Sequence, residues 1–342
     1  MFIKKGVKIN NLFSYWLIIS LMLVFSIIFV GGLTRLTNSG LSIIEWELFK
    51  GILPPLNDDS WNFYFEKYKT IPQYKLLNFN MNLNEFKIIF YWEYIHRILA
   101  RLIGLFFLIP LIYFYFSKKI EKKYLRDCFF IFILILFQGI VGWYMVKSGL
   151  INNVSVSHYR LSLHLTMALI IASSIFWVFK NFLFKKNKKF FNFKKENFPY
   201  QFLLIIIFFQ IIIGAFVSGL DAGLIYQTWP LMGNSYIPDD ILLNKFKYYG
   251  NFDNHSLVQF YHRNLAYFIL LFVCYLSFKI YKDKIKKLYK PFKILFFILI
   301  LQLSLGIITL ISGLNIYLAS AHQITSVFLI LSAINLYYLK SK

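Results

Sequence analysis

Residues 88–116 read IIFYWEYIHRILARLIGLFFLIPLIYFYF, an apolar run interrupted only by a few polar residues near its beginning. An α-helix needs about 20 apolar residues to cross a bilayer, so this run predicts a membrane-spanning helix. Seven other runs in the chain are similar. The eight predicted spans are residues 14–33, 88–116, 124–146, 160–179, 198–220, 256–278, 291–312 and 316–338.

The composition supports a membrane protein, because 58% of the 342 residues are hydrophobic and only 15% are charged. The formal charge of +22 would suggest nucleic-acid binding in a soluble protein. Here the basic residues gather on alternate connections, which indicates topology and no nucleic-acid partner. The basic segments are 4–8, 118–123, 180–195, 279–293 and 340–342.

The positive-inside rule places those basic segments in the cytoplasm. Both termini are then cytoplasmic, and the long segments 34–87 and 220–255 lie outside. We expect a multi-pass protein of the bacterial plasma membrane, in contact with membrane lipid. The first outer segment is rich in aromatic residues, which fits either a cover over a substrate pocket or a docking site for an assembly partner.

The two halves of the chain repeat each other. FVGGL (29–33) pairs with FVSGL (216–220), and GLSIIEW (40–46) pairs with GLIYQTW (223–229). Later matches are HRILA (96–100) with HRNLA (262–266), Gln138-x3-Gly142 with Gln302-x3-Gly306, and SLH (162–164) with SAH (320–322). Because each repeat contains four spans, an even number, the second copy crosses the membrane in the same orientation as the first. The predicted fold is therefore an all-α integral membrane protein of eight transmembrane helices, arranged as two parallel four-helix bundle repeats, 1–195 and 196–342.

Four histidines, paired by the repeat, lie in apolar spans at a similar depth: His96, His164, His262 and His322. One such histidine is as often hydrogen-bonded across a helix interface as it is a functional ligand. Four favour haem, because imidazoles from two helices can take both axial positions of one iron. Zinc fits less well, since no second ligand recurs four residues on and no cysteines cluster. A small residue follows each histidine by one turn and would leave room for a macrocycle: Ala100, Ala168, Ala266 and Ser326.

Two arginines follow histidines directly, Arg97 and Arg263. A guanidinium near the outer interface can pair with haem propionates, or it can simply extend toward water. His158 and His255 have no equivalent in the other half. We interpret them as interface or loop histidines and not as ligands.

Glu93 aligns with Gln259, three residues before the paired histidines, so only the first half has an acid within a span. A buried carboxylate is suited to proton transfer unless Arg97, one turn later, holds it ionised. A structural Glu93–Arg97 pair is the alternative. The asymmetry suggests one reactive haem site and one electron-transfer site.

The motifs EYIHR (93–97), RLSLHL (160–165), FYHR (260–263), AHQ (321–323) and GGLTRLTNSGLS (31–42) together resemble the haem A synthase family of cytochrome oxidase assembly enzymes. The resemblance extends over nearly the whole chain. It implies oxidation of a haem O methyl group to a formyl group, with a bound haem b as redox partner.

The resemblance further implies that His262 and His322 ligate haem b, while His96 and His164 face the substrate haem with Glu93 as the catalytic carboxylate. Some members have a cysteine pair in the first outer segment, and residues 34–87 here contain none. Partners would be haem O, a haem O synthase and an electron-transfer protein. The rival interpretations are a di-haem electron carrier and a non-catalytic haem carrier.

Overall fold

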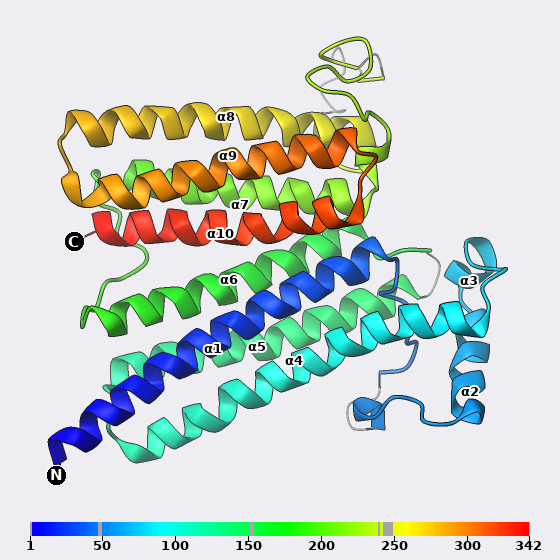
Figure 1. Cartoon of the computed structure of the whole chain (residues 1–342), viewed down its shortest axis with the longest axis horizontal. Helices are drawn as coiled ribbons and strands as arrows, with labels where there is room; N and C mark the ends of the chain where they lie inside the picture. The colour runs from blue at the N-terminus through cyan, green and yellow to red at the C-terminus, as the bar shows by residue number, and fades with distance from the viewer. Residues whose placement is uncertain (1, 47–49, 151–153, 239, 242–248, 342) are drawn as a thin grey trace. The chain divides into compact units, whose positions relative to one another are not determined.

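The computed structural model describes residues 2–46, 50–150, 154–238, 240–241 and 249–341, with residues 2–10 and 50 as backbone only. Within these described residues, eight helices are long and apolar enough to cross a membrane, which confirms the predicted number of spans. They are α1 (Phe2–Leu36), α4 (Leu83–Ser117), α5 (Lys122–Gly149), α6 (His158–Leu183), α7 (Phe198–Gly219), α8 (His255–Lys282), α9 (Tyr289–Ile311) and α10 (Ile316–Lys340) (Figure 1).

A polar cap makes helix α4 longer than its apolar run. The run of α4 was predicted to begin at residue 88, but the helix begins at Leu83. Asn82 caps it, accepting from the backbone amides of Asn84 and Glu85, and Glu85 accepts from the Asn82 amide in return. This capping box provides acceptors for backbone N–H groups at the start of the helix. A prediction based only on the length of the apolar run does not include such polar residues.

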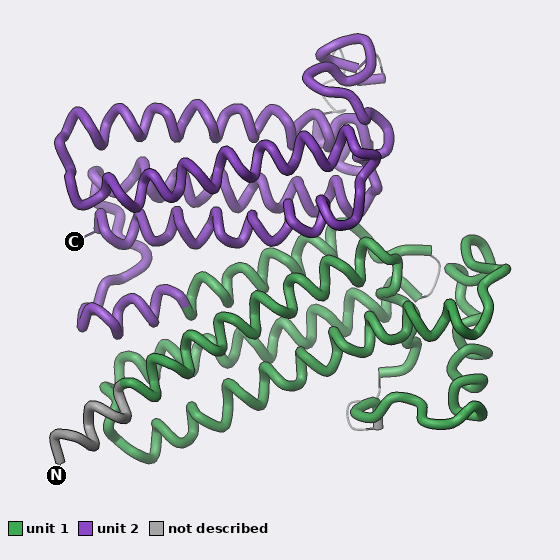
Figure 2. The backbone as a smooth tube through the Cα atoms, in the orientation of Figure 1, with its two compact units in different colours: residues 1–175 green, residues 176–342 purple. Residues whose placement is uncertain are grey.

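The first compact unit comprises residues 1–175 (Figure 2). Its helix α4 packs against both α1 and α5. Pro110 lies inside α4 and has no N–H to donate to the Phe106 carbonyl one turn earlier. The Trp16 indole of α1 supplies the missing donor, with its Nε1 3.1 Å from that carbonyl oxygen. A carbonyl that the proline leaves unpaired thus joins α1 to α4.

The first outer segment is folded. Its helices α2 (Asp58–Lys69) and α3 (Pro72–Leu76) follow the short turn η1 (Lys50–Ile52). Helix α2 packs on the start of α4, and α3 packs on α2. The buried cluster there comprises Leu41, Ile43, Trp61, Phe65, Tyr68, Ile71, Phe86, Ile89 and Phe90. Burial raises the pKa of Tyr68, so the phenol stays protonated and donates to Gln73. Three aromatic residues of this segment, Trp61, Phe65 and Tyr68, thus form a core together with the start of α4.

The second compact unit comprises residues 176–342. Helix α7 contacts α8 and α10, and α9 contacts α8 and α10, so the four helices close into a bundle (Figure 1). The short turns η2 (Ala222–Leu224) and η4 (Lys286–Leu288) connect its elements. The last turns of α6 belong to this unit, where Trp177 stacks on Tyr337. The repeat boundary at residues 195/196 stays a prediction, since the compact units divide within α6.

The Trp16–Phe106 bond predicts a coupled pair of substitutions. Trp16→Phe should cost about 1 kcal/mol of stability, because it leaves the Phe106 carbonyl without a donor. In a Pro110→Ala background the same substitution should cost much less, because the introduced alanine restores a backbone N–H. Denaturation of the four proteins in detergent, followed by circular dichroism, measures the coupling. Equal losses in both backgrounds would contradict this account.

Candidate functional site

The four predicted ligand histidines form two pairs, one in each unit. The ring centres of His96 in α4 and His164 in α6 are 6.4 Å apart. Those of His262 in α8 and His322 in α10 are also 6.4 Å apart. A metal–imidazole bond of about 2 Å, plus about 1 Å from nitrogen to ring centre, places two axial imidazoles about 6 Å apart across one iron. Both pairs therefore have the spacing that a bis-histidine haem requires.

Each histidine packs edge-on against a glycine of the preceding transmembrane helix. A Cβ atom added to any of these glycines would lie 2.9 or 3.0 Å from the Cε1 atom of the imidazole. A side chain at any of these positions would therefore displace the imidazole from its place. The pairs are Gly31 with His96, Gly142 with His164, Gly214 with His262, and Gly306 with His322.

These contacts correct one detail of the repeat. Gly31 and Gly214 are equivalent, because each faces the histidine of the next transmembrane helix in its unit. The difference in residue number between Gly31 and Gly214 equals the difference between the equivalent positions of GLSIIEW (40–46) and GLIYQTW (223–229). Pairing FVGGL with FVSGL was therefore wrong by one helical turn.

A glutamine precedes three of the four glycines by one turn, and Ile27 has that place in α1. Gln138 donates to the His164 carbonyl at 2.9 Å, and Gln210 donates to the His262 carbonyl at 3.0 Å. Gln302 places its side-chain nitrogen 3.4 Å from Nε2 of His322. The sequence comparison had identified this motif in α5 and α9 only.

The Nδ1 atoms of the two histidine pairs have different surroundings. His262 Nδ1 lies 3.1 Å from the side-chain nitrogen of Gln210, and His322 Nδ1 lies 3.1 Å from the backbone carbonyl of Gln302. The Nδ1 atoms of His96 and His164 are buried and have no hydrogen-bond partner among the described residues.

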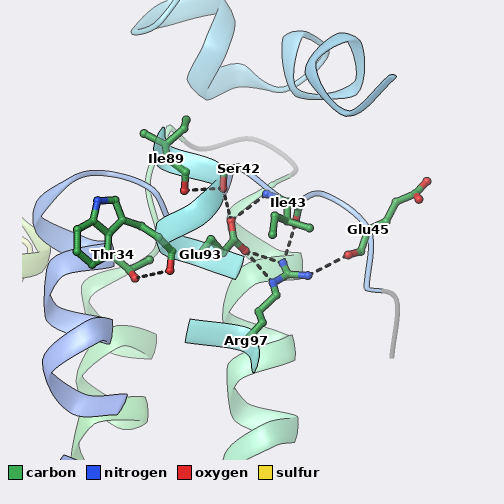
Figure 3. Close-up of polar contacts among 8 residues, drawn as sticks. Thr34, Ser42, Ile43, Glu45, Ile89, Glu93 and Arg97 are labelled. Atoms are coloured by element: carbon green, nitrogen blue, oxygen red, sulfur yellow. Dashed lines mark hydrogen bonds and ion pairs between the residues drawn. The ribbon is translucent and has the colours of Figure 1, made fainter. Parts of the chain in front are cut away.

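Glu93 is held by four hydrogen bonds, two of them from the outer segment (Figure 3). The Ser42 hydroxyl and the Ile43 backbone amide each donate to its Oε2 at 2.8 Å. Arg97 donates to Oε1 at 2.6 and 3.1 Å, and the Glu93 side chain is only 4% exposed. The structure thus contains the Glu93–Arg97 pair that the sequence left as an alternative, and the donors from the outer segment were not foreseen.

Arg97 also fastens the outer segment to α4, by donating to the carbonyls of Ile43 and Glu45 at 2.7 and 2.9 Å (Figure 3). The second unit repeats this contact. Arg263 donates to the carbonyls of Tyr226 and Thr228, which are the repeat equivalents, both at 2.9 Å. Contacts of either arginine with haem propionates stay a prediction.

The second unit lacks the carboxylate. Gln259 donates to the Tyr226 carbonyl at 2.8 Å, and its Oε1 is buried without a hydrogen-bond partner in the described part of the chain. Arg263 Nε is also buried and unpartnered there, whereas Arg97 Nε has Glu93. Within the described residues, Arg97 has a carboxylate partner and Arg263 has none.

His158 and His255 are the first residues of α6 and α8. Neither belongs to a histidine pair. No group of three or more His, Cys, Asp and Glu side chains is placed to hold a metal ion among the residues searched, which are the described ones. Two imidazoles at bis-axial spacing suit a haem, whose macrocycle supplies the other four iron ligands.

Comparison with known proteins gives a consistent family. The model of the cytochrome oxidase assembly protein family matches residues 14–334. A haem A synthase of Pelagibacter ubique is 49% identical over the full length of both chains. Haem A synthases of Rickettsia felis and Flavobacterium psychrophilum are each 40% identical, covering 96% and 92% of this chain and 98% and 94% of their own.

The family match, the full-length relatives and the two histidine pairs agree, and the chain belongs to the cytochrome oxidase assembly protein family.

Proposed function

We infer that this chain is a haem A synthase, a membrane oxidoreductase that oxidises a methyl group of haem O to a formyl group and so supplies haem A for cytochrome oxidase. Full-length relatives of that name at 40–49% identity support the activity. The observation that carries the inference is the pair of bis-histidine spacings, because the reaction needs one haem as substrate and a second redox centre.

His262 and His322 would hold the resident haem b through its iron, and His96 and His164 would hold the substrate haem. The resident group, when bound, supplies one-electron transfer. The unpartnered Nε–H of Arg263 is a donor suited to a propionate of the resident haem. Arg97 has fewer donors left for a propionate, since Glu93 and two carbonyls accept from it.

Glu93 would be the catalytic carboxylate. Two donors from the outer segment and the Arg97 guanidinium all contact its carboxylate oxygens. It would act as a proton acceptor beside the substrate. The same contacts fix where the outer segment lies on α4.

The location would be the bacterial plasma membrane, with both termini in the cytoplasm and both histidine pairs near the outer face. The partners would be membrane lipid, a haem O synthase as the source of substrate and an electron-transfer protein. The basic segments on alternate connections support this topology.

The activity can be tested in cells that make haem O but no haem A. Expression of this chain should cause a formyl haem to appear when the haems are extracted and separated by chromatography. Unmodified haems that copurify without any formyl haem would favour an electron carrier or a haem carrier.

Glu93→Gln should abolish haem A formation, because an amide cannot accept the proton. The second unit already places Gln259 beside Arg263, so an amide is compatible with this position in the fold. The variant should still purify with haem b, and that haem content is the control for folding. Undiminished haem A would remove Glu93 from the mechanism.

Gly306→Ala should lower the amount of haem bound per chain, because a Cβ there would meet the His322 ring at 2.9 Å. Gly139→Ala in α5 is the matched control, since a Cβ there has no neighbour within 4 Å. Haem content by visible absorption should fall several-fold in the first variant and stay unchanged in the second. Equal haem contents would show that the close contact is unnecessary.

A further inference from the structure

The two histidine pairs differ in a feature that the sequence alignment does not reveal. In the second pair both Nδ1 atoms have a group within hydrogen-bond distance, and both groups belong to a glutamine placed one turn before the facing glycine. In the first pair both Nδ1 atoms are buried and unpartnered within the described ranges.

A histidine that binds a metal through Nε2 carries a proton on Nδ1. A partner for that proton fixes the ring orientation and makes the imidazole a stronger ligand. Removing such a partner typically weakens metal binding by about 10-fold to 100-fold. The second pair therefore has the properties of a tight site, and the first pair has those of a weaker one.

At His322 the partner is the Gln302 backbone carbonyl, which can only accept a hydrogen bond. Carbonyls inside a helix are normally shielded by the side chains around them. Gly306, one turn later, removes that shield and lets the imidazole reach the backbone. The Nδ1–H of His322 therefore donates to α9, and its Nε2 faces the Gln302 side-chain nitrogen at 3.4 Å, which an iron bound to Nε2 would displace.

At His262 the partner is the Gln210 side-chain amide. Its nitrogen is 3.1 Å from Nδ1, and its Oε1 is buried without a partner among the residues described. The same nitrogen donates to the His262 carbonyl at 3.0 Å. A turn of the amide about its last side-chain bond gives up both of these contacts and brings the unused oxygen to Nδ1, where it can accept the proton that iron ligation through Nε2 requires. The same position in α1 is Ile27, which offers neither atom to His96.

We propose that Gln210, by its side chain, and Gln302, by its backbone, are positioning residues that make His262 and His322 a permanently occupied haem site. The first pair lacks these partners and so holds its haem more weakly, as a site that must release its product requires. This proposal rests on the proposed function, in which one haem stays and the other turns over.

Gln138 provides the matched control. It has the same place in α5, and it donates to the His164 carbonyl just as Gln210 donates to the His262 carbonyl. It has no hydrogen bond with the Nδ1 atom of His164. Gln138→Leu therefore removes the contact between helices without removing a partner of a ring nitrogen.

The test uses the full chain purified from cells that make protohaem but no haem O. Transfer of haem to excess apomyoglobin measures how fast the resident haem is lost. Gln210→Leu should speed that loss about 10-fold, and Gln138→Leu should leave it unchanged. The midpoint potential of the haem should rise in Gln210→Leu and fall in Gln210→Glu, whose carboxylate accepts the Nδ1 proton more strongly.

The possible outcomes distinguish an error in the positioning role of Gln210 from an error in the assignment of the resident haem site. If Gln210→Leu and Gln138→Leu behave alike, or if both Gln210 variants shift the potential in the same direction, the positioning role is wrong while the function stands. If His262→Ala keeps the haem and His96→Ala loses it, the assignment of the resident site is wrong.

The reciprocal variant, Ile27→Gln, adds the missing glutamine beside His96. Titrated with additional haem, it should release haem from the first pair several-fold more slowly than the unsubstituted protein. An unchanged release rate would overturn the proposal that the missing partner weakens this site.

Discussion

The structure depends on the contact between the edge of an imidazole and the bare backbone of a neighbouring helix. Four glycines allow this contact, and each lies opposite one histidine. Because the ring touches the backbone directly, the two helices must approach closely, and the ring has little freedom to turn. The contact thus fixes where each imidazole lies, and two such contacts per unit set the 6.4 Å spacing of each pair.

Much of this fold could be predicted from sequence, because hydrophobic length is a strong signal in a membrane protein. The number of spans was right. The structure places His96 near His164 and His262 near His322, and their role as haem ligands stays a prediction. The sequence alignment of α7 with α1 was wrong by one helical turn, and the error has a physical reason. A shift of four residues keeps the same face of a helix, so FVGGL and FVSGL match in letters and in periodicity although their positions differ by one turn.

The outer-segment contacts could not be predicted in this way, because they involve backbone atoms. The carbonyls of Ile43 and Glu45 accept from Arg97, and any other side chains there would offer the same oxygen atoms. The Phe106 carbonyl, which Pro110 leaves for Trp16, is a second example. Sequence could name Arg97 as a partner for Glu93, since helical periodicity places them on one face. It contained no sign of the donors from Ser42 and Ile43.

The substitution of Glu93 by Gln259 changes more than the capacity to accept a proton. In the first unit the guanidinium of Arg97 faces a carboxylate, and the pair is close to neutral. In the second unit Arg263 makes the same contacts with the outer segment, but no carboxylate among the described residues balances it. Arg263 is only half-buried, but its Nε is buried without a partner among the described residues, and an anionic ligand group would satisfy that donor and balance the charge. Haem propionates are such groups, so under the proposed function the charge difference would favour lasting retention of haem in the second unit. The proposed ring-nitrogen partners would act in the same direction, and the two differences together would make two similar bundles bind haem with unequal affinity.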